Sequence, residues 1–100
     1  MTLAIVRFTT HPEQATEVEE SVTDLFTAIR ERRPDGMRYL ATRHPDEPEF
    51  ELLLHLADGA QNPLPTIARA ARFREQVAGW ALTDPAPRPV RMLDHYRMLG

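Results

Sequence analysis

Two amphipathic helical stretches, each preceded by a strand-like run, divide the first 80 residues of this 100-residue chain. In the first stretch, apolar residues recur at the three- and four-residue spacing of a single helix face. That face consists of Val18, Val22, Leu25, Phe26 and Ile29. Glutamates occupy the early turns and arginines the last turn, which complements the helix dipole. We expect this helix to begin at a capping box between Thr10 and Glu13 and to stop at Pro34.

Short apolar runs with the two-residue periodicity of strands precede and follow the helices, and they predict strands there. The first three strands are expected at residues 3–9, 37–43 and 50–56, and the second helix from about residue 63 to residue 80. Residues 83–89 contain three prolines and read as an extended connector to a fourth strand at residues 90–99. The order βαββαβ predicts a single α+β domain over residues 1–100. It has a ferredoxin-like fold, in which a four-stranded antiparallel sheet carries both helices on one face.

Both faces of this sheet are expected to be apolar. Leu3 and Ile5 point away from Val6 and Phe8, and the third strand has leucines at consecutive positions around Leu53. Two helices cover only one face, and a face in water would alternate apolar with polar residues. The economical cover for the second face is another copy of the chain, related by a two-fold axis. We therefore expect a homodimer with its sheets packed face to face.

Composition excludes several classes of protein. The chain has no cysteine and only four glycines, so it holds no disulfide, zinc–thiolate site, dinucleotide-binding loop or P-loop. Its net charge of −3 argues against nucleic acid as a partner. No apolar run is long enough for a membrane helix and no secretory signal is visible, so a soluble, cytoplasmic protein with no membrane partner is expected.

Two histidines interrupt apolar strands, and the four histidines show no metal-ligand spacing. Both His55 and His95 are more often hydrogen-bonded core or interface residues than catalysts. Asp94 precedes His95, but neighbours on a strand point to opposite faces and cannot pair. His95 or Tyr96 is the candidate catalytic hydrogen-bond donor, depending on which of the two faces inward.

Trp80 is the only tryptophan and lies where the second helix meets the proline-rich connector. Phe73 precedes it by about two helical turns. Aromatic residues at this spacing usually belong to a core, but a large ring beside a loop also suits the pocket of an aromatic ligand. The sequence leaves both interpretations open.

The order of elements and three segments resemble the antibiotic biosynthesis monooxygenase domain, a family of dimeric α+β barrels. The segments are residues 34–37 (Pro-Asp-Gly-Met), 50–58 (Phe-Glu-Leu-Leu-Leu-His-Leu-Ala-Asp) and 73–76 (Phe-Arg-Glu-Gln). The resemblance implies a homodimer that acts on small aromatic or polyketide-like substrates, often with oxygen and without metal or flavin, so no cofactor is expected. It also implies that Leu54 and Leu56 line the substrate cavity with Phe73 and Trp80, and that His55 faces the dimer partner.

The chain departs from this family at several positions. Leu56 stands where members often have a tryptophan, and Ala68 and Arg72 stand near the usual helical histidines. Haem-degrading relatives carry an asparagine where this chain has Val6, so the haem-degrading constellation is lost. These losses add weight to the alternative, a non-catalytic ligand-binding or interaction dimer on the same scaffold. RNA binding is disfavoured because the third strand is acidic and aliphatic.

Overall fold

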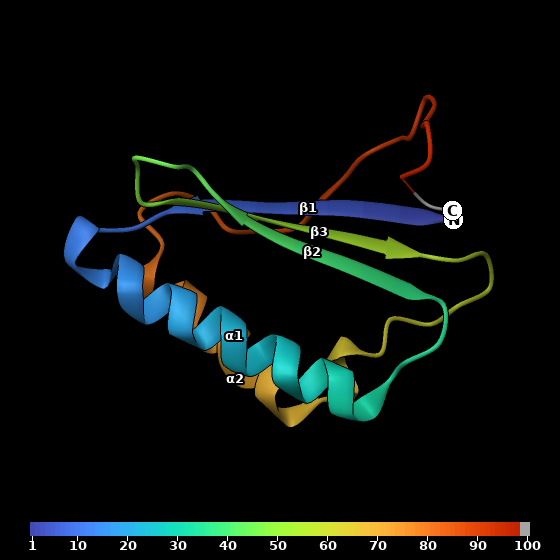
Figure 1. Cartoon of the computed structure of the whole chain (residues 1–100), viewed down its shortest axis with the longest axis horizontal. Helices are drawn as coiled ribbons and strands as arrows, with labels where there is room; N and C mark the ends of the chain where they lie inside the picture. The colour runs from blue at the N-terminus through green and yellow to red at the C-terminus, as the bar shows by residue number, and fades with distance from the viewer. Residues whose placement is uncertain (99–100) are drawn as a thin grey trace.

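The computed structural model describes residues 1–98 and confirms the predicted α+β, ferredoxin-like fold. Its elements, in chain order, are β1 (Thr2–Thr9), η1 (Pro12–Gln14), α1 (Ala15–Arg32), β2 (Met37–Arg43), β3 (Glu49–Leu56), η2 (Leu64–Thr66), α2 (Ala68–Trp80) and β4 (Arg88–Pro89). The sheet has the order β2-β3-β1-β4, and each neighbouring pair is antiparallel. Both helices lie on one side of it (Figure 1). The three long strands and both helices are thus present in the predicted order, and the two helices start later than predicted.

The core lies between the sheet and the two helices. Phe8 on β1 and Phe50 on β3 face each other in register, and their rings stack with centroids 5.5 Å apart. The predicted apolar face of α1 packs onto this layer: three of its residues are buried and two are partly buried against the core. Arg69 on α2 ties the helices together, since it donates hydrogen bonds to the Gln76 side chain and to the carbonyl of Ser21 on α1.

The start of the first helix differs from the prediction. Thr10 and Glu13 do not form a capping box, because the Thr10 hydroxyl donates to the backbone carbonyl of His11 at 3.0 Å. The chain instead enters α1 through the short 3-10 turn η1, with Pro12 in its first turn, where a missing N–H costs nothing. The helix ends as expected. Arg33 adopts a left-handed conformation (φ 46°) and its amide donates to the carbonyl of Ile29 at 2.9 Å.

The second helix begins five residues later than predicted. Ile67 is extended (φ −103°, ψ 111°) and buried in the core, so the helix proper starts at Ala68. Residues before it form the 3-10 turn η2, and the Asn62 side chain just ahead of this turn accepts a hydrogen bond from the Leu64 amide at 3.0 Å. The proline-rich approach to α2 therefore makes a separate turn rather than a first helical turn.

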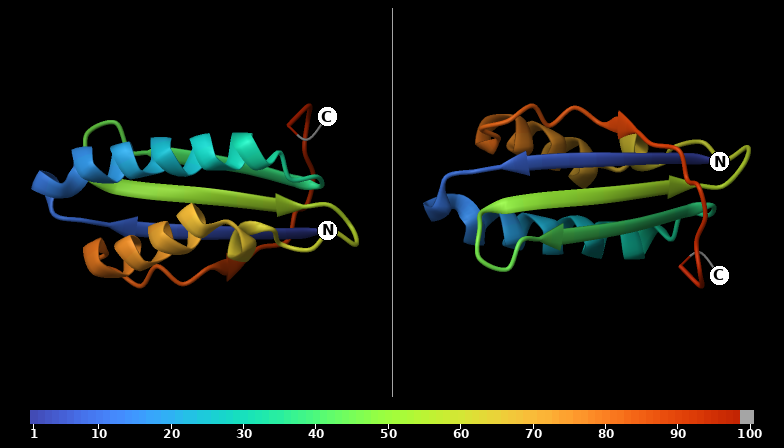
Figure 2. Two further views of the ribbon diagram at one scale, coloured as in Figure 1. Left: turned by 90° about the horizontal axis from the view of Figure 1, so that it is seen from below. Right: turned by 90° about the horizontal axis from the view of Figure 1, so that it is seen from above.

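The predicted position of the fourth strand is wrong. The strand pairs Arg88 with Ile5 and Pro89 with Ala4, and the Val90 amide then donates to the Leu3 carbonyl at 2.8 Å. Val90 already lies at Leu3, one residue from the start of β1 at Thr2, so the residues after Val90 have no part of β1 left to pair with. The following segment instead crosses the face of the sheet away from the helices (Figure 2). Leu99, at the end of the predicted strand, lies outside the described residues.

Candidate functional site

The four predicted substrate-binding residues lie on the helix side of the sheet. Leu54 and Leu56 share a face of β3 with the core residue Phe50, since strand side chains alternate. Phe73 and Trp80 belong to the core and are only 4% and 8% exposed. The two aromatic rings are therefore packed into the interior in this structure, as the core interpretation of Trp80 expects. Their binding role stays a prediction.

The predicted catalytic pair lies elsewhere. His95 and Tyr96 belong to the segment that follows β4, which runs on the opposite side of the sheet from α1 and α2 (Figure 1). Tyr96 is 77% exposed, and its ring packs against the Arg97 guanidinium at 5.0 Å. The His95 amide donates to the Asp94 carboxylate at 2.8 Å. One chain by itself does not bring this pair to Trp80, and its catalytic role also stays a prediction.

His55 lies on the sheet face away from the helices, beside Leu3 of β1 and Arg38 of β2 in the register. Its Nδ1 atom is buried and has no hydrogen-bond partner within residues 1–98. This is the face on which the sequence analysis places the dimer partner. Within residues 1–98, no group of three or more histidine, aspartate or glutamate side chains is placed to hold a metal ion.

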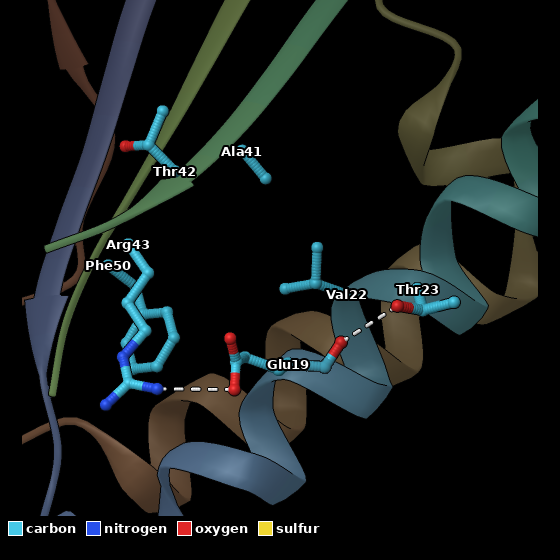
Figure 3. A pocket seen from close by; sticks show the side chains of 7 residues that line it. All are labelled: Glu19, Val22, Thr23, Ala41, Thr42, Arg43 and Phe50. Atoms are coloured by element: carbon cyan, nitrogen blue, oxygen red, sulfur yellow. Dashed lines mark hydrogen bonds and ion pairs between the residues drawn. The ribbon is translucent and has the colours of Figure 1, made fainter. Parts of the chain in front are cut away.

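A groove that the sequence analysis missed opens between α1 and β2. It has a volume of about 250 Å³, and seven residues line it (Figure 3). These residues are Glu19, Val22, Thr23, Ala41, Thr42, Arg43 and Phe50. Val22 and Ala41 give the groove apolar walls, whereas Glu19 and Arg43 bring opposite charges to it from the helix and the strand.

Arg43 is held in three directions in this groove. Its Nη1 donates to the Glu19 carboxylate at 3.2 Å, and its Nε donates to the Glu47 carbonyl at 3.3 Å. The guanidinium carbon lies 5.7 Å from the centre of the Phe50 ring, within the range of a cation–π contact. The sequence could have predicted which way Arg43 points. It follows Met37, Tyr39 and Ala41 at two-residue spacing, so it lies on the same, helix-facing side of β2.

Next to the groove, Tyr39 on β2 stacks on Phe26 of α1, with ring centres 5.2 Å apart and planes 5° from parallel. Burial raises the pKa of Tyr39 to about 12 because the phenolate would lose its hydration. The Tyr39 hydroxyl is therefore protonated at neutral pH. It can donate a hydrogen bond but does not act as a base there.

The sequence matches no protein-family profile and no curated protein. Solved structures are more informative. A protein of Deinococcus radiodurans named a "putative antibiotic biosynthesis monooxygenase" superposes with a TM-score of 0.73 at 16% identity, over 100% of both chains. The chain has the fold of this protein.

Two further proteins that carry the same name have this fold. For that of Nitrosomonas europaea, the TM-score is 0.68 at 20% identity, over 92% of this chain and 89% of the other. For that of Caulobacter crescentus, it is 0.67 at 15% identity, over 93% and 90%. No helix within residues 1–98 is long and apolar enough to cross a membrane.

Proposed function

We propose that the chain is a small-molecule enzyme resembling cofactor-independent monooxygenases, acting on aromatic or polyketide-like substrates in the cytoplasm. The observation that carries the proposal is the full-length likeness to the Deinococcus radiodurans protein, which is named an antibiotic biosynthesis monooxygenase. The substrate class and the lack of a cofactor are what the sequence resemblance implies. The sequence has no cysteine and no glycine-rich cofactor loop, and in the proposed chemistry the substrate itself supplies the electrons.

The proposed reaction begins when a phenol-like substrate loses a proton and becomes an electron-rich carbanion, which then attacks dioxygen. For a ring CH₂ group that becomes a carbonyl, one oxygen atom enters the product and the other leaves as water with the two hydrogens. This balance needs no further reductant. The protein would bind the ring, exclude water and stabilise the enolate.

Phe73, Trp80, Leu54 and Leu56 are the proposed substrate-binding residues, and His95 or Tyr96 is the proposed donor to the enolate. Phe73 and Trp80 are almost fully covered, so an aromatic ligand needs the helix layer to move before it can contact them. The segment after β4, which carries His95 and Tyr96, runs on the other side of the sheet (Figure 1). These two residues can act on the helix side only if this segment rearranges or a second copy supplies them.

The proposed unit is a homodimer. On the sheet face away from the helices, Leu3, Ile5 and Leu53 are only partly covered, and Leu40 is 50% exposed. Together they form an apolar patch of the kind that monomeric proteins rarely leave in water. A two-fold contact between two such faces would bury about 800 Å² per partner if it is of the usual size.

Oxygen uptake tests the enzyme proposal. The protein is incubated with hydroxylated aromatic compounds in an oxygen-electrode cell, and the expected result is substrate-dependent oxygen consumption with no added flavin, haem or metal. Heat-denatured protein is the control. If oxygen is consumed only after a cofactor is added, or by no member of a broad substrate panel, the enzyme proposal is wrong.

The alternative is a dimer that binds ligands or partners without catalysis. The burial of Phe73 and Trp80 favours it, because packed core rings offer a substrate no surface in this state. Under this alternative the protein is a dimer that consumes no oxygen. The oxygen assay therefore separates the two functions.

A further inference from the structure

The groove between α1 and β2 combines features that suit a flat, negatively charged organic molecule. Its base includes the ring of Phe50, and Val22 and Ala41 supply apolar walls. The Arg43 guanidinium stands at one end, already oriented by the Glu47 carbonyl and by the ring of Phe50. A guanidinium fixed in this way loses little side-chain entropy when it binds a carboxylate.

The present partner of that guanidinium is a carboxylate from the chain itself. Glu19 reaches Arg43 from α1 at 3.2 Å, and the two side chains are 54% and 32% exposed. A pair this accessible contributes little to stability, because water and salt screen it. The Arg43–Glu19 pair is therefore easily opened, and a carboxylate from outside can take the place of Glu19.

We propose that this groove is a binding site for planar aromatic carboxylates, in which Arg43 recognises the carboxylate and Glu19 competes with the ligand for Arg43. The aromatic part of the ligand lies along Val22 and Ala41. The Phe50 ring is buried beneath the Arg43 guanidinium and serves to orient it. The proposal concerns binding alone. It requires neither turnover nor dimer formation, and it assigns a ligand to a place other than the predicted pocket around Trp80.

The competition gives the two charged residues opposite effects on ligand affinity. In Glu19→Gln the competing charge is gone, so naphthoate binds more tightly, by about two- to fivefold, since an exposed ion pair costs little to open. In Arg43→Gln the recognising charge is gone, so affinity falls by about tenfold or more. Arg43→Lys keeps the charge but not the planar two-pronged donor, so its affinity lies between those of the wild type and Arg43→Gln. A purely structural ion pair does not produce this opposite pair of changes.

The test is a titration of the full chain with naphthoate, followed by amide chemical shifts in NMR. We expect saturable shifts in β2 near Arg43 and in α1 near Glu19, the affinity order just given, and weaker binding at high salt. Naphthylmethanol, which has the same rings without the charge, is the matched ligand and should bind at least about tenfold more weakly. Glu75→Gln and Arg72→Gln make the same charge changes on the exposed surface of α2 and should leave the affinity unchanged.

Several outcomes overturn the proposal. It is wrong if naphthoate produces no saturable shifts, if the shifts map to other elements, or if Glu19→Gln and Arg43→Gln change affinity in the same direction. A spectrum with native dispersion identifies the variants that fold, and Arg43→Lys still tests the site if Arg43→Gln does not fold. Because no oxygen is consumed in this experiment, the binding site and the proposed enzyme activity succeed or fail separately.

Discussion

The two faces of the sheet are built from the same strands, but the chain covers only one of them with its helices. On the helix side, Phe8 and Phe50 are buried beneath α1 and α2, and the chain covers this face by itself. On the other side, Ile5 and Leu53 lie directly opposite each other in register and remain partly open. The apolar side chains of the first face pack against the helices of the same chain, whereas those of the second face pack against no helix. The chain closes the helix side by its own folding, and the other side is the face on which we propose the dimer contact.

The largest expected effect is on the helix side. Trp80→Ala removes a core ring, and we expect a loss of about 3–5 kcal/mol in the free energy of unfolding. Leu93→Ala is the matched change in the segment after β4, where the side chain is 91% exposed, and it should cost the single chain less than about 0.5 kcal/mol. Denaturant unfolding measures both. Similar losses in the two variants would contradict the contrast between the faces.

The next effect concerns the sheet face away from the helices, called the open face below. Ile5→Glu places a charge in the proposed dimer contact, and burying it without a partner should weaken dimerisation by about a hundredfold or more. The fold should survive, because Ile5 lies outside the core cluster. Sedimentation measures the dimer affinity, and circular dichroism checks the fold. Glu75→Gln, on α2, is the control. A variant that stays as fully dimeric as the wild type would place the contact elsewhere.

A smaller effect comes from Tyr39, whose pKa is raised by burial from 10.0 to about 12. The folded state holds this proton more tightly than the unfolded state. The stability it contributes is therefore complete below pH 10 and is lost as the pH rises toward 12. Over this range the wild type should lose about 1–3 kcal/mol more than Tyr39→Phe, which has no such proton. Parallel pH profiles for the two proteins would show that Tyr39 is not buried as described.

The smallest effect belongs to Arg7 and Glu51, which form an ion pair on the open face. Their hydrogen bond raises the pKa of Arg7, but the Arg7 side chain is 63% exposed, so water screens the pair. A double-mutant cycle with Arg7→Gln and Glu51→Gln, measured on the dissociated monomer, should show almost no coupling. A strong coupling would mean that this face is drier in the single chain than its exposure indicates.

Periodicity was sufficient to predict the long elements, because their apolar residues repeat at the spacing of the structure they form. The face of α1 around Leu25 and the alternation of β3 around Leu52 are examples. It failed where neighbouring segments decide the outcome. The position of β4 depends on its register with β1, and the start of α2 depends on the extended conformation of Ile67. Neither is a local property of the sequence.

The candidate sites were less predictable than the fold. The sequence placed Trp80 beside a loop, but only the packing of α2 shows that its ring belongs to the core. The groove at Arg43 requires a strand residue and Glu19, which are 24 positions apart, to meet across the helix–sheet layer. The alternation of β2 predicts that Arg43 faces inward, but nothing in the sequence predicts that Glu19 on α1 is its partner.

Light scattering on the unmodified protein at micromolar concentration tests directly whether a second copy covers the open face of the sheet. The chain has a mass of 11.4 kDa, and the account predicts a particle of twice that mass. A particle with the mass of one chain, stable across a concentration series, would contradict it.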